Sequence, residues 1–189
     1  MRIGLDIDNV ITNFDEVVLA EFLKEDKNKR NTGIVNKNAT WISKGMFDWS
    51  KDEIDNFFID NMERMSNILK PLDGAKIYMD RLISDGHELF LISNRPNKHY
   101  RNPKEITSNW LRNYDINYTK LIISRTSNKS MECIDNKIDV MVDDIIDNCL
   151  QLSLANIRCI LMSTKYTDGY CDGLEVAYGW LDLYDKLCR

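Results

Sequence analysis

The stretch Ile3-Gly4-Leu5-Asp6-Ile7-Asp8-Asn9-Val10-Ile11 is a short apolar run that contains two carboxylates spaced one residue apart. The run predicts a buried β-strand at Ile3–Ile7. Residues two apart in a strand point to the same side, so Asp6 and Asp8 are expected to lie together. Two like charges at a buried strand end repel each other unless a cation or a proton transfer makes use of them. This pair is therefore the first candidate for a functional site.

Other apolar runs repeat this strand pattern along the chain. Buried parallel strands are predicted at Leu89–Ile92, Val140–Val142 and Cys159–Met162, with a weaker one at Leu121–Ile123. Helical patterns between them cover Lys76–Ser84, Pro103–Tyr114, Asn128–Asn136 and Ile145–Asn156. Alternating strands and helices predict an α/β fold with a doubly wound parallel sheet and helices on both faces. Ligands of such sheets bind at the carboxyl ends of the strands.

One segment interrupts the alternation. From Asn13 to Lys70 there is no convincing strand, whereas Phe14–Lys24 has helical spacing and Ser50-Lys51-Asp52-Glu53 is a capping box that begins a helix. About sixty residues are too long for an ordinary crossover between two strands. We expect residues 13–70 to form a small helical cap, and residues 1–12 and 71–189 to form the catalytic core.

Composition narrows the class of protein and its partners. The chain has 189 residues, of which 43% are hydrophobic, and a net charge of −5. An acidic chain does not favour a nucleic-acid polymer as partner. No stretch approaches the ~20 apolar residues of a membrane span, and the N-terminus lacks the pattern of a signal peptide. The five cysteines, at positions 133, 149, 159, 171 and 188, form no Cys-x-x-Cys and indicate reduced thiols in a cytoplasmic protein.

Polar residues follow the predicted core strands. Ser93 comes directly after Leu89–Ile92, and Asp143-Asp144 come directly after Val140–Val142. Lys129 stands at the start of the helix that precedes the Asp-Asp strand. We expect these side chains to meet the first two aspartates at the carboxyl edge of the sheet.

In this order, the motifs resemble those of the haloacid dehalogenase superfamily. The four motifs are Asp6-x-Asp8-x-Val10, Ser93, Lys129 and Asp143-Asp144, and the cap between the first two resembles that of C1-capped members. Three segments more narrowly resemble the 5'-nucleotidase/5'(3')-deoxyribonucleotidase family, namely Leu5–Val10, Ile92–Pro96 and Val142–Asp144. The tail from Tyr166 through Val176–Asp182 is similar to that family's closing segment. The resemblance implies a Rossmann-like core with the cap inserted after the first strand.

The resemblance also implies a Mg²⁺-dependent phosphomonoesterase. Asp6 would attack phosphorus and form an aspartyl-phosphate, while Asp8 would act as general acid and then as general base. The Ser93 hydroxyl and the Asn94 amide would hold phosphoryl oxygens. Lys129 would offset the charge that develops on them.

A hard cation is expected because several carboxylates would otherwise face a phosphate dianion. The family pattern implies that Asp6, the Asp8 carbonyl and Asp144 bind Mg²⁺. Asp143 would lie nearby or act through a water molecule.

Several assignments remain open on the sequence alone. Lys120 and Lys137 also precede core strands and compete with Lys129 for its role. Arg95 is placed either as a phosphate clamp or as the partner of a surface acid. His99 and Arg101, in the loop after Ser93, are expected to be exposed to solvent.

The cap contains the aromatic residues of a prospective substrate pocket. Trp41, Phe47 and Trp49 lie in a less regular segment and are predicted to form pocket walls, where one of them would stack on a nucleobase. Phe57 and Phe58 are predicted to pack in the core of the cap itself.

The favoured substrate is a small phosphorylated molecule, most simply a nucleoside or deoxynucleoside monophosphate. The sequence Ser93-Asn94-Arg95-Pro96 differs from the tripeptide of mammalian-type deoxyribonucleotidases, which weakens any transfer of their preference. Three alternatives compete: a phosphatase for another small phosphate such as a sugar phosphate, a PIN-type metal-dependent nuclease, and a non-catalytic phosphate-binding module. The sequence does not indicate an oligomeric state.

Overall fold

The computed structural model describes residues 1–167 and 173–188. Its strands are β1 Arg2–Leu5, β2 Glu88–Asn94, β3 Lys120–Ser124, β4 Val140–Asp143, β5 Arg158–Met162 and β6 Glu175–Ala177. Its helices are α1 Phe14–Lys29, the π-helical segment η1 Ile42–Met46, α2 Lys51–Ile68, α3 Ala75–Ser84, α4 Pro103–Asn113, α5 Ser130–Asp135, α6 Ile146–Leu154 and α7 Trp180–Cys188.

The six strands form one parallel sheet in the order β3-β2-β1-β4-β5-β6. From β1 the chain adds β2 and then β3 on one side of the sheet. It then returns to place β4 on the other side of β1, followed by β5 and β6. The strand order therefore reverses between β1 and β4, where a doubly wound sheet places its ligand crevice. This topology confirms the predicted fold class.

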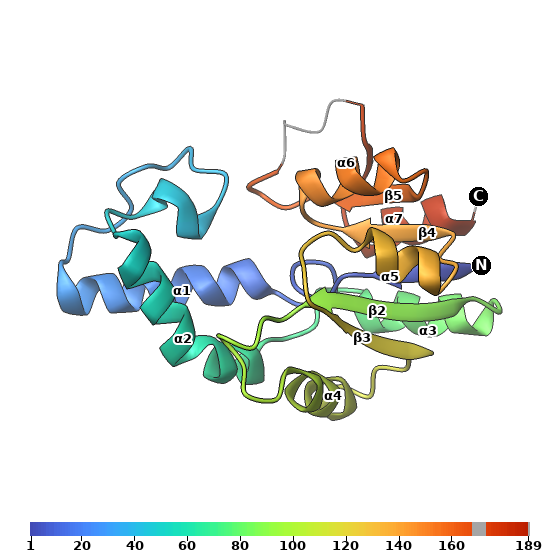
Figure 1. Ribbon diagram of the computed structural model, residues 1–189, viewed down its shortest axis with the longest axis horizontal. Helices are drawn as coiled ribbons and strands as arrows, with labels where there is room; N and C mark the ends of the chain where they lie inside the picture. The colour runs from blue at the N-terminus through green and yellow to red at the C-terminus, as the bar shows by residue number, and fades with distance from the viewer. Residues whose placement is uncertain (168–172, 189) are drawn as a thin grey trace.

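Helices cover both faces of the sheet, as Figure 1 shows. The side chains of Leu5, Met79 and Trp180 belong to one buried cluster, on the face of α3, α4 and α7. Met141 and Leu152 belong to another, on the face of α5 and α6. Because β1 and β4 are buried on both faces, they read as continuous apolar runs in the sequence.

The segment between Asn13 and Lys70 contains only helices and loops. It leaves and rejoins the sheet at a single point, where the Asn13 amide donates to the Lys70 carbonyl at 3.0 Å. Both halves of the capping box at the start of α2 are present. Figure 1 shows α1, η1 and α2 standing beside the sheet, and they share a hydrophobic cluster around Phe22. That residues 13–70 act as a cap remains a prediction.

The C-terminal part adds two elements that the sequence patterns did not predict, β6 and α7. α7 brings Trp180 under the first motif, where its buried indole N–H donates to the Val10 carbonyl at 2.8 Å. The closing segment therefore supports the loop that carries Asp6 and Asp8.

The remaining sequence expectations concern thiols and membranes. Cys133, Cys149, Cys159 and Cys188 are free cysteines, whereas Cys171 lies outside the described residues. Among the helices of residues 1–167 and 173–188, none is long and apolar enough to cross a membrane.

Candidate active site

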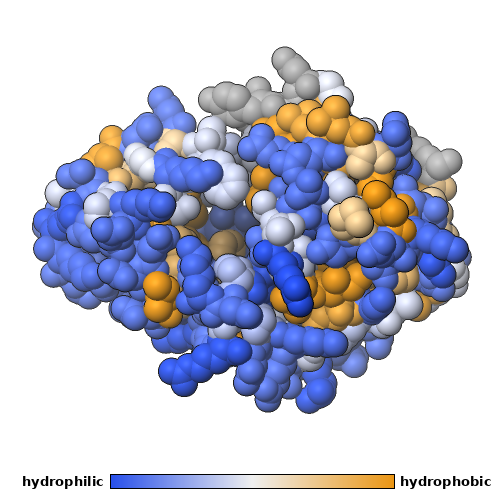
Figure 2. Space-filling model, in the orientation of Figure 1, coloured by the Kyte–Doolittle hydropathy of each residue, from blue (hydrophilic) through white to orange (hydrophobic). Residues whose placement is uncertain are grey.

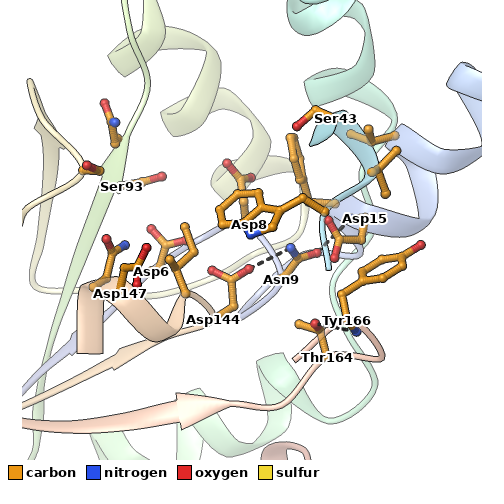
Figure 3. A pocket seen from close by; sticks show the side chains of 18 of the residues that line it. Asp6, Asp8, Asn9, Asp15, Ser43, Ser93, Asp144, Asp147, Thr164 and Tyr166 are labelled. Carbon is orange, nitrogen blue, oxygen red and sulfur yellow. Dashed lines mark hydrogen bonds between the residues drawn. The ribbon is translucent and has the colours of Figure 1, made fainter. Parts of the chain in front are cut away.

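The polar residues of the four motifs meet at the carboxyl edge of the sheet. β1 and β4 are neighbouring strands, so Asp6, which follows β1, and Asp143, which ends β4, lie side by side at the same edge. Figure 3 shows Asp6, Asp8, Asp144 and Ser93 around one cavity. The parallel direction of the strands produces this meeting, because all carboxyl ends lie on the same edge.

Lys129 is the cation at the centre of this group. Its Nζ donates to Asp6 Oδ1 at 2.5 Å and to Asp143 Oδ2 at 2.7 Å, and its side chain is 3% exposed. The two carboxylates raise the pKa of Lys129 against the opposing effect of burial, so the ammonium group stays charged. The two competing lysines lie elsewhere: Lys137 is exposed, and Lys120 donates to Asn136 Oδ1.

Asp6 lies at the floor of the cavity and is 6% exposed. Burial raises its pKa to about 6, and the charges of Asp143 and Asp8 act in the same direction, whereas Lys129 lowers it. The carboxylate is thus held in an environment that lacks enough positive charge to stabilise it fully.

Asp143 and Asp144 have different surroundings although they are adjacent. Asp143 is fully buried and does not line the cavity, because its oxygens accept hydrogen bonds from Lys129, from the Ile145 amide and from the Asn148 side chain. Asp144 lines the cavity. Burial raises the pKa of Asp144 well above its usual range, and the charges of Asp143 and Asp6 raise it further.

Asn9 joins the first and fourth motifs. Its Nδ2 donates to Asp144 Oδ2 at 2.8 Å, and its Oδ1 accepts the Asp15 backbone N–H at 2.8 Å. Its φ of 60° lies in the left-handed region, which Asn tolerates better than most residues. Asn9 was not predicted as a site residue from the sequence, and its position as a polar residue directly after Asp8 is the signal that could have identified it.

The donor set fits a divalent cation. Asp6 and Asp144 present carboxylate oxygens to the cavity, and Asp144 has a neutral amide as its hydrogen-bond partner. Hard cations such as Mg²⁺ prefer such oxygen ligands. Within the described ranges, no preformed cluster of three or more metal-ligating side chains is found. Asp143, by contrast, does not line the cavity.

Ser93 and Asn94 end β2 and line the same cavity. Ser93 is 1% exposed. Asn94 Oδ1 is buried and has no hydrogen-bond partner among the described residues. An unpaired buried acceptor costs free energy, so a bound ligand group that donates a hydrogen bond would relieve it.

Arg95 is neither a phosphate clamp in the cavity nor the partner of a surface acid, the two roles expected from the sequence. Its side chain is buried and does not line the cavity; its Nη2 donates to Asp8 Oδ1 at 2.8 Å. Both predictions are wrong in this structure, because Arg95 forms its ion pair with Asp8, the second carboxylate of the first motif.

The cavity has a volume of about 530 Å³ and lies between the sheet edge and the inserted helices. Figure 2 shows it as a hollow between the two parts of the molecule. Its aromatic walls are Phe14, Trp41, Phe58, His99, Tyr100 and Tyr166. Trp41 is therefore where the sequence analysis expected it, whereas Phe58 lines the cavity besides packing in the cap cluster.

Phe47 and Trp49 are not walls of the cavity, which corrects the expectation from the sequence. Trp49 stacks on Phe22 with ring centroids 4.7 Å apart, and Phe47 lies 5.4 Å from the same ring. The Trp49 indole N–H also donates to the buried Asp26 at 3.0 Å. Burying Asp26 requires donors, and this requirement draws Trp49 into the core of the inserted segment.

Phe14 and His99 were missed as cavity residues. Phe14 begins α1 six residues after Asp8, and that closeness in sequence is a usable signal. His99 is half-buried rather than exposed, because it packs against Phe58 with ring centroids 5.8 Å apart. Arg101 is exposed, as expected.

Comparison with known proteins places these findings in a family. The family model described as "5' nucleotidase, deoxy (Pyrimidine), cytosolic type C protein" matches residues 1–189. Comparison with curated protein sequences returns no match.

Solved structures share the fold at low sequence identity. A predicted phosphatase from Clostridium acetobutylicum is 13% identical, with a TM-score of 0.71 over 99% of this chain and 97% of its own. A haloacid dehalogenase-like hydrolase from Streptococcus pneumoniae is 10% identical, with a TM-score of 0.69 over 98% and 97%. A predicted phosphoglycolate phosphatase from Haemophilus somnus is 17% identical, with a TM-score of 0.64 over 100% and 97%.

Proposed function

Because the chain belongs to the family of 5' nucleotidase, deoxy (Pyrimidine), cytosolic type C proteins and is a phosphoric monoester hydrolase of the haloacid dehalogenase superfamily, we propose that it hydrolyses nucleoside or deoxynucleoside monophosphates. The observation that carries this proposal is the position of Asp6. Its carboxylate lies against Lys129 at the floor of a cavity whose walls are aromatic.

In the proposed reaction, a carboxylate oxygen of Asp6 attacks phosphorus, and the bond from phosphorus to the nucleoside oxygen breaks. Asp8 gives its proton to the leaving oxygen. Water then attacks the aspartyl-phosphate, and Asp8 takes the proton of that water, which releases phosphate and regenerates Asp6. Asp8 lines the cavity and is half-buried, so it can reach both the leaving oxygen and the water.

The phosphoryl oxygens would be bound by the Ser93 hydroxyl and the Asn94 amide, which donate hydrogen bonds to them. Lys129 would stabilise the negative charge that develops on them, since a buried cation acts strongly where water is excluded. Asp143 receives a supporting role here: it accepts a hydrogen bond from Lys129 and so fixes the position of the ammonium group.

The proposal includes Mg²⁺, held by Asp6, Asp144 and the Asp8 backbone carbonyl. When bound, the ion would neutralise charge on the phosphoryl oxygens and on the carboxylates. Direct binding by Asp143 is left out of the proposal, because its oxygens are engaged with Lys129, Ile145 and Asn148.

The aromatic walls favour a nucleoside over a plain sugar. Phe14, Trp41 and Phe58 line the cavity. Stacking of a base on an aromatic side chain is worth ~1–3 kcal/mol, an interaction that a sugar phosphate without a base would lack. The PIN-type nuclease has no support, because the chain matches a different family along its whole length.

The function is tested with a panel of phosphomonoesters, measured as release of inorganic phosphate. We expect nucleoside monophosphates to be hydrolysed with Mg²⁺, and activity to be lost with EDTA and restored by added Mg²⁺. If the protein hydrolysed sugar phosphates but no nucleotides, the proposal would be replaced by the alternative of a phosphatase for another small phosphate. Cleavage of RNA without turnover of any monophosphate would overturn it.

Asp8→Asn is expected to lower kcat by ~10²–10⁴-fold, the usual contribution of a general acid and base. The amide oxygen of Asn can still accept the hydrogen bond from Arg95, so the side chain keeps its place and loses only its proton transfer. Steady-state phosphate release from the purified variant measures the effect. Activity equal to that of the unmodified protein would remove Asp8 from the proposed mechanism.

A further inference from the structure

We propose that Arg95 is a positioning residue that ties the carboxylate of Asp8 to the inserted helices, so that Asp8 is correctly placed only while those helices stand over the site. This inference rests on the proposed function, because it assigns Asp8 the proton-transfer role. Arg95 does not line the cavity and therefore acts through Asp8, which does.

The first contact of Arg95 is with the reaction site. Arg95 directly follows β2, and its side chain is 3% exposed. Its Nη2 lies 2.8 Å from Asp8 Oδ1, whereas the Asp8 side chain is 20% exposed and reaches the cavity. A charged hydrogen bond from a buried guanidinium group fixes the rotamer of this partly exposed carboxylate.

The second set of contacts is with Ser66 of the inserted segment and with Tyr100 of the loop after β2, whose side chain packs in the same hydrophobic cluster as Phe22. Arg95 Nη1 donates to the Tyr100 hydroxyl at 3.2 Å and, more weakly, to Ser66 Oγ at 3.4 Å. Ser66 belongs to α2, and its Oγ lies 3.0 Å from the Tyr100 hydroxyl. One guanidinium group thus joins the loop after β1, the loop after β2 and a helix of the insertion.

The buried position of the Arg95 guanidinium group contributes little to the stability of the fold. Removing a guanidinium group from water is costly, and the attraction to one half-exposed carboxylate compensates that cost only in part. Arg95 Nε is buried and has no hydrogen-bond partner among the described residues. Any movement that carries α2 and its Ser66 away from Arg95 would expose this group to water and weaken its hold on Asp8.

The chemical consequence depends on the leaving group. A nucleoside alkoxide is a poor leaving group and needs a proton from Asp8 as the bond breaks. Nitrophenolate is a good leaving group that departs without one. A misplaced Asp8 therefore slows the first kind of substrate much more than the second, whereas a general loss of structure slows both equally.

The test compares kcat/KM for a nucleoside monophosphate and for p-nitrophenyl phosphate, since this ratio covers the steps from free enzyme and substrate to phosphoryl transfer and leaves out hydrolysis of the aspartyl-phosphate. Arg95→Met is expected to lower the first by ~10²-fold and the second by less than ~5-fold, because only the first needs the acid. Arg95→Lys retains a cation for Asp8 without the fork that reaches α2, and we expect an intermediate loss. Arg101→Met, an exposed arginine in the same loop, is the control that changes neither.

A second measurement needs no activity. If Arg95 links Asp8 to α2, hydrogen exchange of the backbone amides at 62–69 rises in Arg95→Met and also in Asp8→Ala, but not in Arg101→Met. Tyr100→Phe, which removes one acceptor of Arg95, serves as a milder variant if Arg95→Met does not fold.

The outcomes separate the two proposals. Equal losses on both substrates, or unchanged exchange at 62–69 in Asp8→Ala, would overturn the role of Arg95. Absence of turnover by the unmodified protein would overturn the proposed function instead, and the exchange measurement would still decide whether Arg95 forms the link.

Discussion

Asp6→Asn is expected to abolish phosphate release, with a loss of ~10⁴-fold or more, because an amide oxygen is too weak a nucleophile to form the acyl-phosphate. The substitution is nearly isosteric, so the Lys129 contact at Asp6 Oδ1 can be kept by the amide oxygen. The measurement is release of inorganic phosphate from a nucleoside monophosphate with Mg²⁺.

The same variant separates chemistry from folding. Burial raises the pKa of Asp6 to about 6, so the ionised carboxylate costs folding free energy at neutral pH. A neutral Asn avoids this cost, and we expect the thermal midpoint of Asp6→Asn to equal or exceed that of the unmodified protein. Asp73→Asn, at an exposed position, is the matched control. An Asp6→Asn variant that retains activity would exclude the aspartyl-phosphate mechanism.

Lys129→Met is expected to damage both stability and activity. It leaves Asp6 and Asp143 buried without their cation, and breaking a buried pair costs ~3–5 kcal/mol of unfolding free energy. Loss of the ammonium group also raises the pKa of Asp6 further, because Lys129 lowers it. The nucleophile is then protonated more readily, and we expect phosphate release to fall by ~10³-fold as this charge and the transition-state contact are lost together.

Chemical denaturation measures the loss of unfolding free energy in Lys129→Met, and release of inorganic phosphate measures its loss of activity. Lys120→Met is the control, since Lys120 is exposed and contacts Asn136 outside the cavity. Equal stability of Lys129→Met and the unmodified protein would contradict the central position given to Lys129. A larger loss of activity in Lys120→Met would transfer its role to Lys120.

The central strands were predictable because both faces of β1, β2, β4 and β5 are covered by helices. Such strands appear as apolar runs that local patterns detect. β6 was missed because it is three residues long and its first two residues are half-buried, which leaves almost no pattern to read. The segment η1 was missed for a related reason: Lys44 and Gly45 depart from helical dihedral angles, so its apolar residues lack a regular spacing.

Which aromatic residues of the inserted segment line the cavity could not be predicted from the sequence. Trp41, Phe47 and Trp49 lie within nine residues and have similar hydrophobicity, yet only Trp41 lines the cavity. The other two were drawn inward by the ring of Phe22 and by the buried carboxylate of Asp26. Both partners come from α1, and nothing local to positions 41–49 indicates that contact.

By itself the sequence determined the alternation of strands and helices, and it placed Asp6, Ser93 and Asp143 within two residues of the ends of β1, β2 and β4. The exact ends differ, since β1 ends at Leu5 rather than Ile7 and β2 continues to Asn94. These features depend on periodicity and on neighbouring residues, which are local properties of the chain. Only the tertiary structure decided the partner of each charge. Lys129 meets Asp6 across 123 positions, and Arg95 meets Asp8 across 87. Such pairs form because packing removes these groups from water and leaves each with the opposite charge that the fold places beside it.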